Sequence, residues 1–112
     1  MLMSDKNTDV QKTLNLAVQN HKKGNLGLAE ELYIKTLKIN PDHERSIYLL
    51  STLHLHKRNY DEAIKLSNRA LEINPNNIHV IRNLGYGLIQ VGKHEESEKL
   101  FYKIHFCNLL YL

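Results

Sequence analysis

Apolar positions along the chain recur with the period of a helix. In the segment 43–57, Ile47, Leu50, Leu53 and His54 follow the spacing that brings side chains onto one helical face. The pattern therefore predicts an amphipathic helix over about 43–57, which stops at the break 58–59.

A second helix is predicted directly after this break. It begins near Tyr60, and Asp61 and Glu62 stand in its first turn, where carboxylates suit the helix dipole. It ends at the pair 74–75, Asn-Pro, because proline cannot extend a helix and restricts the residue before it. The two segments together form a helix-turn-helix unit.

The same unit recurs every 34 residues. The segment 38–41, Lys-Ile-Asn-Pro, returns as 72–75, Glu-Ile-Asn-Pro, and Ala29 returns as Ala63 and as the small residue Ser97. Self-similarity at such a period is the mark of a repeat architecture. Further matching positions are Leu16, Leu50 and Leu84; Gly24, Arg58 and Gly92; Leu37 and Leu71; Tyr33, Ser67 and Phe101.

The repeat predicts an all-α fold in a single domain, 1–112. Its three units cover about 10–43, 44–77 and 78–108, with additional helices predicted over about 8–22, 26–39 and 77–91, and from 94 onward. One helix pair cannot bury its apolar face alone, so the units must stack. Small residues, Ala29, Ala63 and Gly85, are expected where helices approach closely.

Composition narrows the classes of partner. The chain has 112 residues, 42% of them hydrophobic and 24% charged, with a net charge of +3. Lys and Arg alternate with Asp and Glu, so no concentrated basic stripe indicates nucleic-acid binding. No apolar run approaches the roughly 18 residues of a membrane span. The first residues lack the pattern of a signal peptide, and Cys107 has no partner for a disulfide. We expect a cytoplasmic protein without a nucleic-acid or membrane partner.

The sequence contains no motif that indicates catalysis or metal binding. His54 and His56 lie two residues apart on a predicted helix and should point in different directions. No helical pair of metal ligands and no glycine-rich phosphate loop appears. Glu95, Glu96 and Glu98 are interpreted as the acidic first turn of a helix. The sequence predicts no enzyme, no catalytic residue, no metal and no cofactor.

The repeated positions resemble the tetratricopeptide repeat family across about residues 10–108. That family has a leucine and a small residue on the first helix, a glycine at the turn, small and aromatic residues on the second helix, and a closing proline. The resemblance implies three stacked helix-turn-helix units that form a short right-handed α-solenoid and bind a protein or peptide. It is carried by Leu16, Ala17, Gly24, Ala29, Tyr33 and Pro41 in the first unit, Leu50, Ser51, Ala63, Ala70 and Pro75 in the second, and Leu84, Gly85, Gly92 and Phe101 in the third.

The first unit has a narrower resemblance. The segments 21–26, His-Lys-Lys-Gly-Asn-Leu, and 29–33, Ala-Glu-Glu-Leu-Tyr, are similar to the opening repeat of certain bacterial proteins. In those proteins such repeats precede a glycosyltransferase, sulfotransferase or methyltransferase domain. By this resemblance the chain is expected to be the N-terminal portion of a larger transferase.

The family resemblance also implies a peptide-binding groove along the first helices. Asn and Gln amides can bond a peptide backbone as donor and acceptor, and Arg45 and Arg82 can take carboxylates bidentately. The implied groove residues are Gln11, Asn15, Lys22, Arg45, Tyr48, Thr52, His56, His79, Arg82, Asn83, Tyr86 and Gln90.

Two binding modes of the family can be compared with these positions. The clamp that holds a terminal carboxylate would need Lys, Asn and Arg at positions that here hold Leu14, Val18, Leu49, His79 and Asn83, so this mode is rejected. The asparagine ladder that holds a peptide backbone in glycosyltransferase arrays matches Asn15 and Asn83, with Leu49 between them. A solvated polar face is the alternative interpretation of these asparagines.

The third unit ends differently from the other two. Leu109 stands where the closing proline is expected, and the segment 106–112 forms an atypical apolar tail. Repeat arrays normally end on a polar capping helix. The tail therefore indicates either a truncated array or a homodimer through the C-terminal end. The alternative function is accordingly a self-associating or truncated fragment without an independent binding function.

Overall fold

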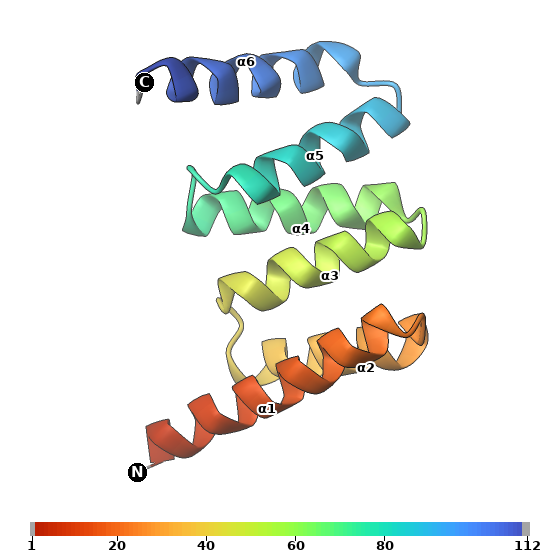
Figure 1. Ribbon diagram of the computed structural model, residues 1–112, viewed down its shortest axis with the longest axis vertical. Coiled ribbons are helices and arrows are strands. Elements are labelled where there is room, and N and C mark those ends of the chain that lie inside the picture. The colour runs from red at the N-terminus through yellow and green to blue at the C-terminus, as the bar shows by residue number, and fades with distance from the viewer. Residues whose placement is uncertain (1, 111–112) are drawn as a thin grey trace.

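The computed structural model describes residues 2–110, and it describes side chains over 6–105. Within that range the chain consists of helices joined by short turns, with no strand (Figure 1). This confirms the predicted all-α fold. The helices are α1 (Leu2–Lys22), α2 (Leu26–Ile39), α3 (Glu44–His56), α4 (Tyr60–Ile73), α5 (Ile78–Gln90) and α6 (His94–Leu110). We use unit one, unit two and unit three for the pairs α1–α2, α3–α4 and α5–α6.

The four inner helices begin and end within about one residue of their predicted bounds, but α1 is longer than predicted. It starts at Leu2 and not near Thr8. No proline or glycine occurs in 2–8, so nothing in the sequence stops the helix there. At the other end, α6 includes the backbone of 106–110. The side chains of the predicted apolar tail, Cys107 among them, lie outside the described residues, as do 111 and 112 entirely.

The turn inside each unit has the same backbone form. Gly24, Arg58 and Gly92 have φ angles of 84°, 63° and 85°, the left-handed region that favours glycine. In unit one the N–H of Asn25 bonds the carbonyl of Asn20, which is the closure of a Schellman motif. Equivalent bonds close the other two turns. The 34-residue register read from the sequence is therefore a backbone register as well, even where arginine replaces glycine.

An asparagine ends the second helix of units one and two. The Oδ1 of Asn74 accepts the backbone N–H of Asn76 at 3.2 Å, which turns the chain toward α5. Glu44, at the start of α3, ties this turn to unit two. Its Oε1 accepts hydrogen bonds from Asn74 Nδ2 at 3.2 Å and from Asn77 Nδ2 at 2.8 Å. The Asn77 side chain also caps α5 through the N–H groups of His79 and Val80.

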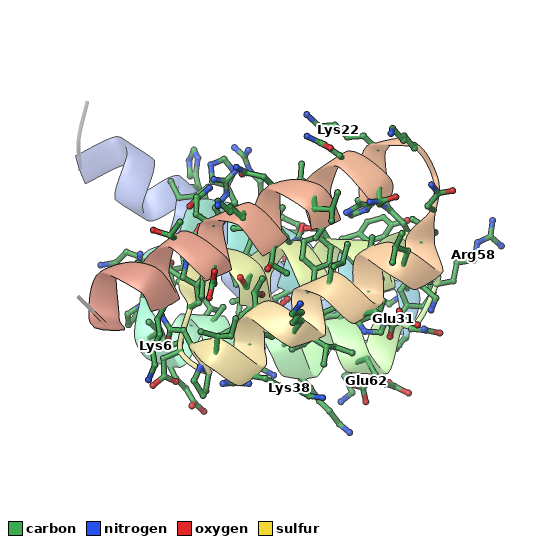
Figure 2. All side chains as sticks on the ribbon, turned by 90° about the horizontal axis from the view of Figure 1, so that it is seen from below. Lys6, Lys22, Glu31, Lys38, Arg58 and Glu62 are labelled. Atoms are coloured by element: carbon green, nitrogen blue, oxygen red, sulfur yellow. The ribbon has the colours of Figure 1, made fainter. Side chains whose placement is uncertain are left out.

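The helices form two layers. The first helices contact one another, α1 with α3 and α3 with α5, whereas the described parts of α2, α4 and α6 share no such contacts. The first helices therefore line the inner face of a stacked solenoid. The molecule is elongated along the stack, 44 × 30 × 20 Å (Figure 1). Seen along the stack, Lys38 and Glu62 project from the layer of second helices, and Lys22 from the opposite side (Figure 2).

The core runs between the layers. One cluster joins units one and two through Leu14, Ala17, Ala29, Tyr33, Leu50 and Leu53, and a second joins units two and three through Ile47, Ala70 and Val80. Leu37 and Leu66 pack against both clusters, which makes the core continuous. Ala29 and Ala63 are fully buried where helices cross, as their size predicted.

The helix crossing inside each unit pairs a small residue with a residue of variable size. In unit two Ser51 meets Ser67, with 2.8 Å between their hydroxyl oxygens. In unit three a Cβ added to Gly85 would lie 2.9 Å from Phe101 Cζ, so a larger residue there would displace that ring. The close approach expected at Gly85 is thus confirmed, and its cause is the aromatic side chain on α6.

Candidate functional site

The twelve residues implied for the groove all lie on the first helices. α1 carries Gln11, Asn15 and Lys22; α3 carries Arg45, Tyr48, Thr52 and His56; α5 carries His79, Arg82, Asn83, Tyr86 and Gln90. Tyr48, Thr52 and Asn83 are half-buried, and the remaining nine are exposed. None is locked inside the core, so each can contact a ligand.

Contacts across the inner face join α3 to α5. Asn83 Nδ2 donates to Thr52 Oγ1 at 2.9 Å. The rings of Tyr48 and His79 lie with their centroids 6.0 Å apart. These four implied residues therefore form one surface across two units, with Asn83 Oδ1 left to accept a further hydrogen bond.

A histidine that the sequence analysis did not select joins α1 to α3. His21 Nε2 lies 2.8 Å from Nδ1 of His56, and His21 Nδ1 lies 2.9 Å from the hydroxyl of Tyr33. Burial, and then the neighbouring His56, lower the pKa of His21. Burial raises the pKa of Tyr33 to about 12, against the opposing charge of Arg45. This cluster is a hydrogen-bonded connection from the core to the inner face.

One signal could have identified His21. Its equivalents in the 34-residue register are Leu55 and Ile89, so a polar ring stands at a position that is apolar in the other two units. A polar residue at an apolar repeat position needs a partner when it is partly buried.

The asparagine ladder has a gap in this structure. Asn15 Oδ1 accepts from Gln11 Nε2 at 2.9 Å along α1, which leaves the amide N–H groups of Asn15 to donate. Leu49, the middle position, is half-buried and packs against the core. The first clamp position, Leu14, is 1% exposed and belongs to the core. A backbone ligand would thus meet amides near the two ends of the inner face and an apolar surface between them.

The inner face is cationic. Lys22, Arg45 and Arg82 are exposed, and none of the ion pairs found over residues 6–105 involves them. α5 carries no acidic residue, and α3 carries only Glu44, which is engaged with the asparagines after α4. The acidic residues of α1, Asp5 and Asp9, stand in its first turns, at the opposite end of that helix from Lys22. Because uncompensated cations line one side of the stack, this face should attract carboxylates.

The implied residues also reach the flank and the end of this face, where Lys22, His56 and Gln90 are the last residues of the three first helices. Tyr86 approaches Tyr60 of α4, with ring centroids 6.3 Å apart. Tyr86 and Gln90 would contact the flank or the end of an extended ligand.

A separate groove lies at the C-terminal end of the stack. It has a volume of about 410 Å³ and a mostly apolar lining. Its residues come from α6, together with one from α5, and none belongs to the implied groove. They are Ile89, His94, Ser97, Glu98, Phe101, Tyr102 and His105.

The two histidines of α3, His54 and His56, have different partners. His54 Nε2 lies 3.6 Å from Glu30 Oε1, whereas His56 bonds His21, so the two rings do point apart. Among the described residues no group of three or more His, Cys, Asp or Glu side chains could hold a metal ion. Nor is any helix in this part of the chain both long and apolar enough to cross a membrane.

The family model described as anaphase-promoting complex, cyclosome, subunit 3 matches residues 19–104. No curated protein matches the chain significantly in sequence.

Several solved structures share the fold. A point mutant of MamA is 29% identical, with a TM-score of 0.76 over 84% of this chain and 69% of that one. A mutant O-GlcNAc transferase of Thermobaculum terrenum is 26% identical, with a TM-score of 0.81 over 87% of this chain and 19% of the transferase. The second TPR of Spaghetti (RPAP3), bound to the HSP90 peptide SRMEEVD, is 15% identical, with a TM-score of 0.84 over 92% of this chain and 97% of that one. The last likeness shows the fold alone.

Proposed function

Because the chain belongs to the tetratricopeptide-type family described as anaphase-promoting complex, cyclosome, subunit 3, we propose that it is a protein-interaction module without a catalytic role of its own. Its inner face, formed by α1, α3 and α5, binds an extended acidic segment of a partner protein. A cytoplasmic location, expected from the sequence, is part of this proposal.

The charge of the inner face is the observation that carries the proposal. Arg45 and Arg82 stand on neighbouring first helices with exposed guanidinium groups, and each can bind a carboxylate through two hydrogen bonds. On the same two helices Asn83 can bond a peptide backbone through its Oδ1, while Thr52 Oγ1, which donates to the carbonyl of Tyr48 at 3.1 Å, accepts from the Asn83 amide. Tyr48 adds amphipathic contact area at low entropic cost. This combination suits a peptide whose backbone is held by amides and whose acidic side chains meet arginine.

Two of the similar structures support this function at the level of the fold. In the Spaghetti structure the same arrangement of helices holds a peptide. In the O-GlcNAc transferase the matched region is 19% of the chain, so the module is one part of a larger enzyme there. That the present chain serves as the N-terminal portion of a larger transferase is part of our proposal, and it agrees with the narrower resemblance of unit one.

A displayed library of random peptides tests the proposal. We expect the protein to enrich peptides with clustered Asp and Glu. For an enriched peptide, Arg45→Ser with Arg82→Ser should weaken binding by about tenfold or more, since each arginine loses a charge-assisted hydrogen bond. Fluorescence anisotropy measures the affinity, and circular dichroism checks that the variant keeps its helices.

The matched control removes two cations from the outer layer. Lys35→Ser with Lys38→Ser makes the same change in net charge on exposed positions of α2. This control should bind the enriched peptide as the unaltered protein does. If it weakens binding as much as the arginine variant does, the attraction depends on net charge, and the groove assignment is wrong. Enrichment of no peptide would also overturn the proposal.

Self-association through the C-terminal end is the second candidate function. The groove on α6 favours it, because a lining of exposed apolar side chains is costly to leave in water. If this candidate is correct, the protein self-associates, and Phe101→Ser on α6 weakens that association. Arg45→Ser with Arg82→Ser on the inner face leaves it unchanged.

A further inference from the structure

The groove on α6 is equivalent to a groove on α4 that is filled. In the 34-residue register Ile89 and Glu98 correspond to Leu55 and Ile64. Those two residues of unit two lie beneath α5. A Cβ added to Gly87 would be 3.1 Å from Ile64 Cγ1 and 3.8 Å from Leu55 Cδ2. The groove at the C-terminal end is therefore the position that the first helix of a following unit would occupy.

Exposure supports this equivalence. Leu55, Ile64 and Leu71 of unit two are half-buried, and Ser67 is fully buried. Their equivalents in unit three are all exposed: Ile89 at 38%, Phe101 at 41%, and also Glu98 and His105. Among the described residues, the lining differs from that of unit two mainly because no helix lies over it.

The charge of the groove indicates which kind of helix fits. Glu98 lies two repeats after Glu30, on the same face of its helix. Glu30 meets the end of α3, because Nζ of Lys57, the residue just after α3, lies 2.7 Å from Glu30 Oε2. At the same position unit two has Ile64, opposite Gly87. A helix that fills the groove on α6 should therefore carry a cation in the place of Lys57.

α1 of another copy meets this requirement. In the register Lys23, just after α1, is equivalent to Lys57, and Leu16 is equivalent to Leu50, which packs in the core. Among the described residues no helix packs on this face of α1, where Lys23 is exposed and Leu16 is 48% exposed. The outer face of α1 thus carries both the cation and the apolar residue that α3 uses against α2.

The lengths of the two terminal helices agree with such a contact. α1 begins eight residues earlier in the register than α3, and α6 ends three residues later than α4. In an antiparallel helix pair the start of α1 lies beside the end of α6. Both lengthened ends point to the same side of the stack, the left in Figure 1, so they would run alongside each other.

We propose that the chain associates head to tail, with α1 of one copy seated in the groove on α6 of another. Lys23 of one copy pairs with Glu98 of the next, as Lys57 pairs with Glu30 within the chain. Such a contact joins two different surfaces, so it propagates into a chain of copies unless the rotation closes a ring. This inference rests on the second candidate function and is independent of peptide binding. It is the alternative to a longer array, as in a larger transferase, where a following unit would fill the groove.

Sedimentation velocity at rising protein concentration tests it. The unaltered protein should form species larger than a dimer. Lys23→Glu alone and Glu98→Lys alone should each weaken association by about tenfold, because each brings two like charges together. An equimolar mixture of the two variants should associate again, because every contact between unlike copies then has opposite charges. Lys38→Glu, on the exposed face of α2, is the matched control and should associate normally.

Each alternative has its own outcome. A symmetric contact between two C-terminal ends would weaken with Phe101→Ser, would not respond to Lys23→Glu, and would stop at the dimer. That result overturns the head-to-tail arrangement and leaves self-association standing. If the protein is monomeric at every concentration, both the head-to-tail arrangement and the symmetric dimer are wrong. The groove on α6 would then be a site for a different polypeptide. Peptide binding by the inner face can still be measured on that monomer.

Discussion

Tyr33 and Phe101 occupy the same position in units one and three, yet their surroundings differ. Tyr33 is 0% exposed, and Phe101 is 41% exposed. Each has a small residue at the equivalent position on the first helix of its unit: Ala17 belongs to the core cluster of Tyr33, and Gly85 lies against the ring of Phe101. The contacts inside the unit are thus similar, and the difference arises outside it.

The difference is the next unit. Tyr33 shares its core cluster with Leu50 and Leu53 of α3, which close over it. No described residue plays that role for Phe101. A helix pair in this fold therefore buries its own aromatic residue only in part, and the following unit completes the burial. This is expected where each repeat is stabilised by its nearest neighbours.

The strongest test of this comparison removes the two rings in turn. Tyr33→Ala should lower the free energy of unfolding by about 3–5 kcal/mol, because it leaves a cavity in a closed core. Phe101→Ala should cost only about 1–2 kcal/mol, because much of its surface is already in water. Urea unfolding followed by circular dichroism measures both.

Tyr33→Phe is the control for the first substitution. It keeps the ring and removes only the hydroxyl that bonds His21, so it should cost about 1 kcal/mol. Equal losses for the two alanine variants would show that the following unit does not provide the difference.

A double-mutant cycle tests the contact inside unit three. Gly85→Ala should gain helix propensity but push against Phe101 Cζ, 2.9 Å from the new Cβ. In a Phe101→Ser background the same change should gain the full propensity. The two backgrounds should therefore differ by about 1 kcal/mol in the effect of Gly85→Ala on unfolding. An additive result would mean that the ring of Phe101 does not rest on Gly85.

The turns extend the comparison to the backbone. Arg58 has the φ angle that Gly24 and Gly92 adopt without strain. A residue with a side chain is strained in this left-handed conformation, and glycine is not. Arg58→Gly should therefore stabilise the protein by about 0.5–1 kcal/mol, less than the full strain because glycine also makes the unfolded chain more flexible. The reverse change, Gly92→Arg, should destabilise it by a similar amount. Thermal unfolding measures both, and a loss of stability in Arg58→Gly would contradict the strain.

The smallest effect concerns the polar partner of Tyr33. The pKa of His21 is lowered from its ordinary 6.5 in the folded protein. The imidazole of His21 therefore binds a proton more readily in the unfolded chain than in the folded chain. Stability should thus fall as the pH drops below about 6.5. His21→Gln, which cannot titrate but can still bond Tyr33, should reduce this slope. A remaining slope is expected from His43, whose pKa is also lowered by burial and then by Arg45.

Much of the fold could be predicted from single positions. The return of Asn-Pro at 34 residues, and the match of Gly24, Arg58 and Gly92, were sufficient to place the helices and turns. These features depend on local backbone preferences and on helical periodicity. The size of Gly85 likewise predicted a crossing, because only close contact requires so small a residue.

Other features depend on neighbours and could not be predicted. His21 is important through Tyr33 and His56, which lie 12 and 35 residues away and meet only in the folded stack. The exposure of Phe101 depends on what lies above α6, not on the residue itself. The residues that the resemblance implies for a groove lie on the first helices, as it implied, but their cross-helix bonds, such as Asn83 to Thr52, join residues of different units that meet only in the folded stack.

The pairing of sizes at the crossing inside each unit has an evolutionary consequence. Ser67 meets Ser51, whereas Phe101 meets Gly85, so the two helices of a unit have become matched to each other. An exchange of genetic material that breaks between α5 and α6 would bring Phe101 against a serine, and the ring would no longer fit. Recombination that breaks in the loops between units keeps each pair together. Whole units, and not single helices, are therefore the pieces that can be duplicated or exchanged in this chain.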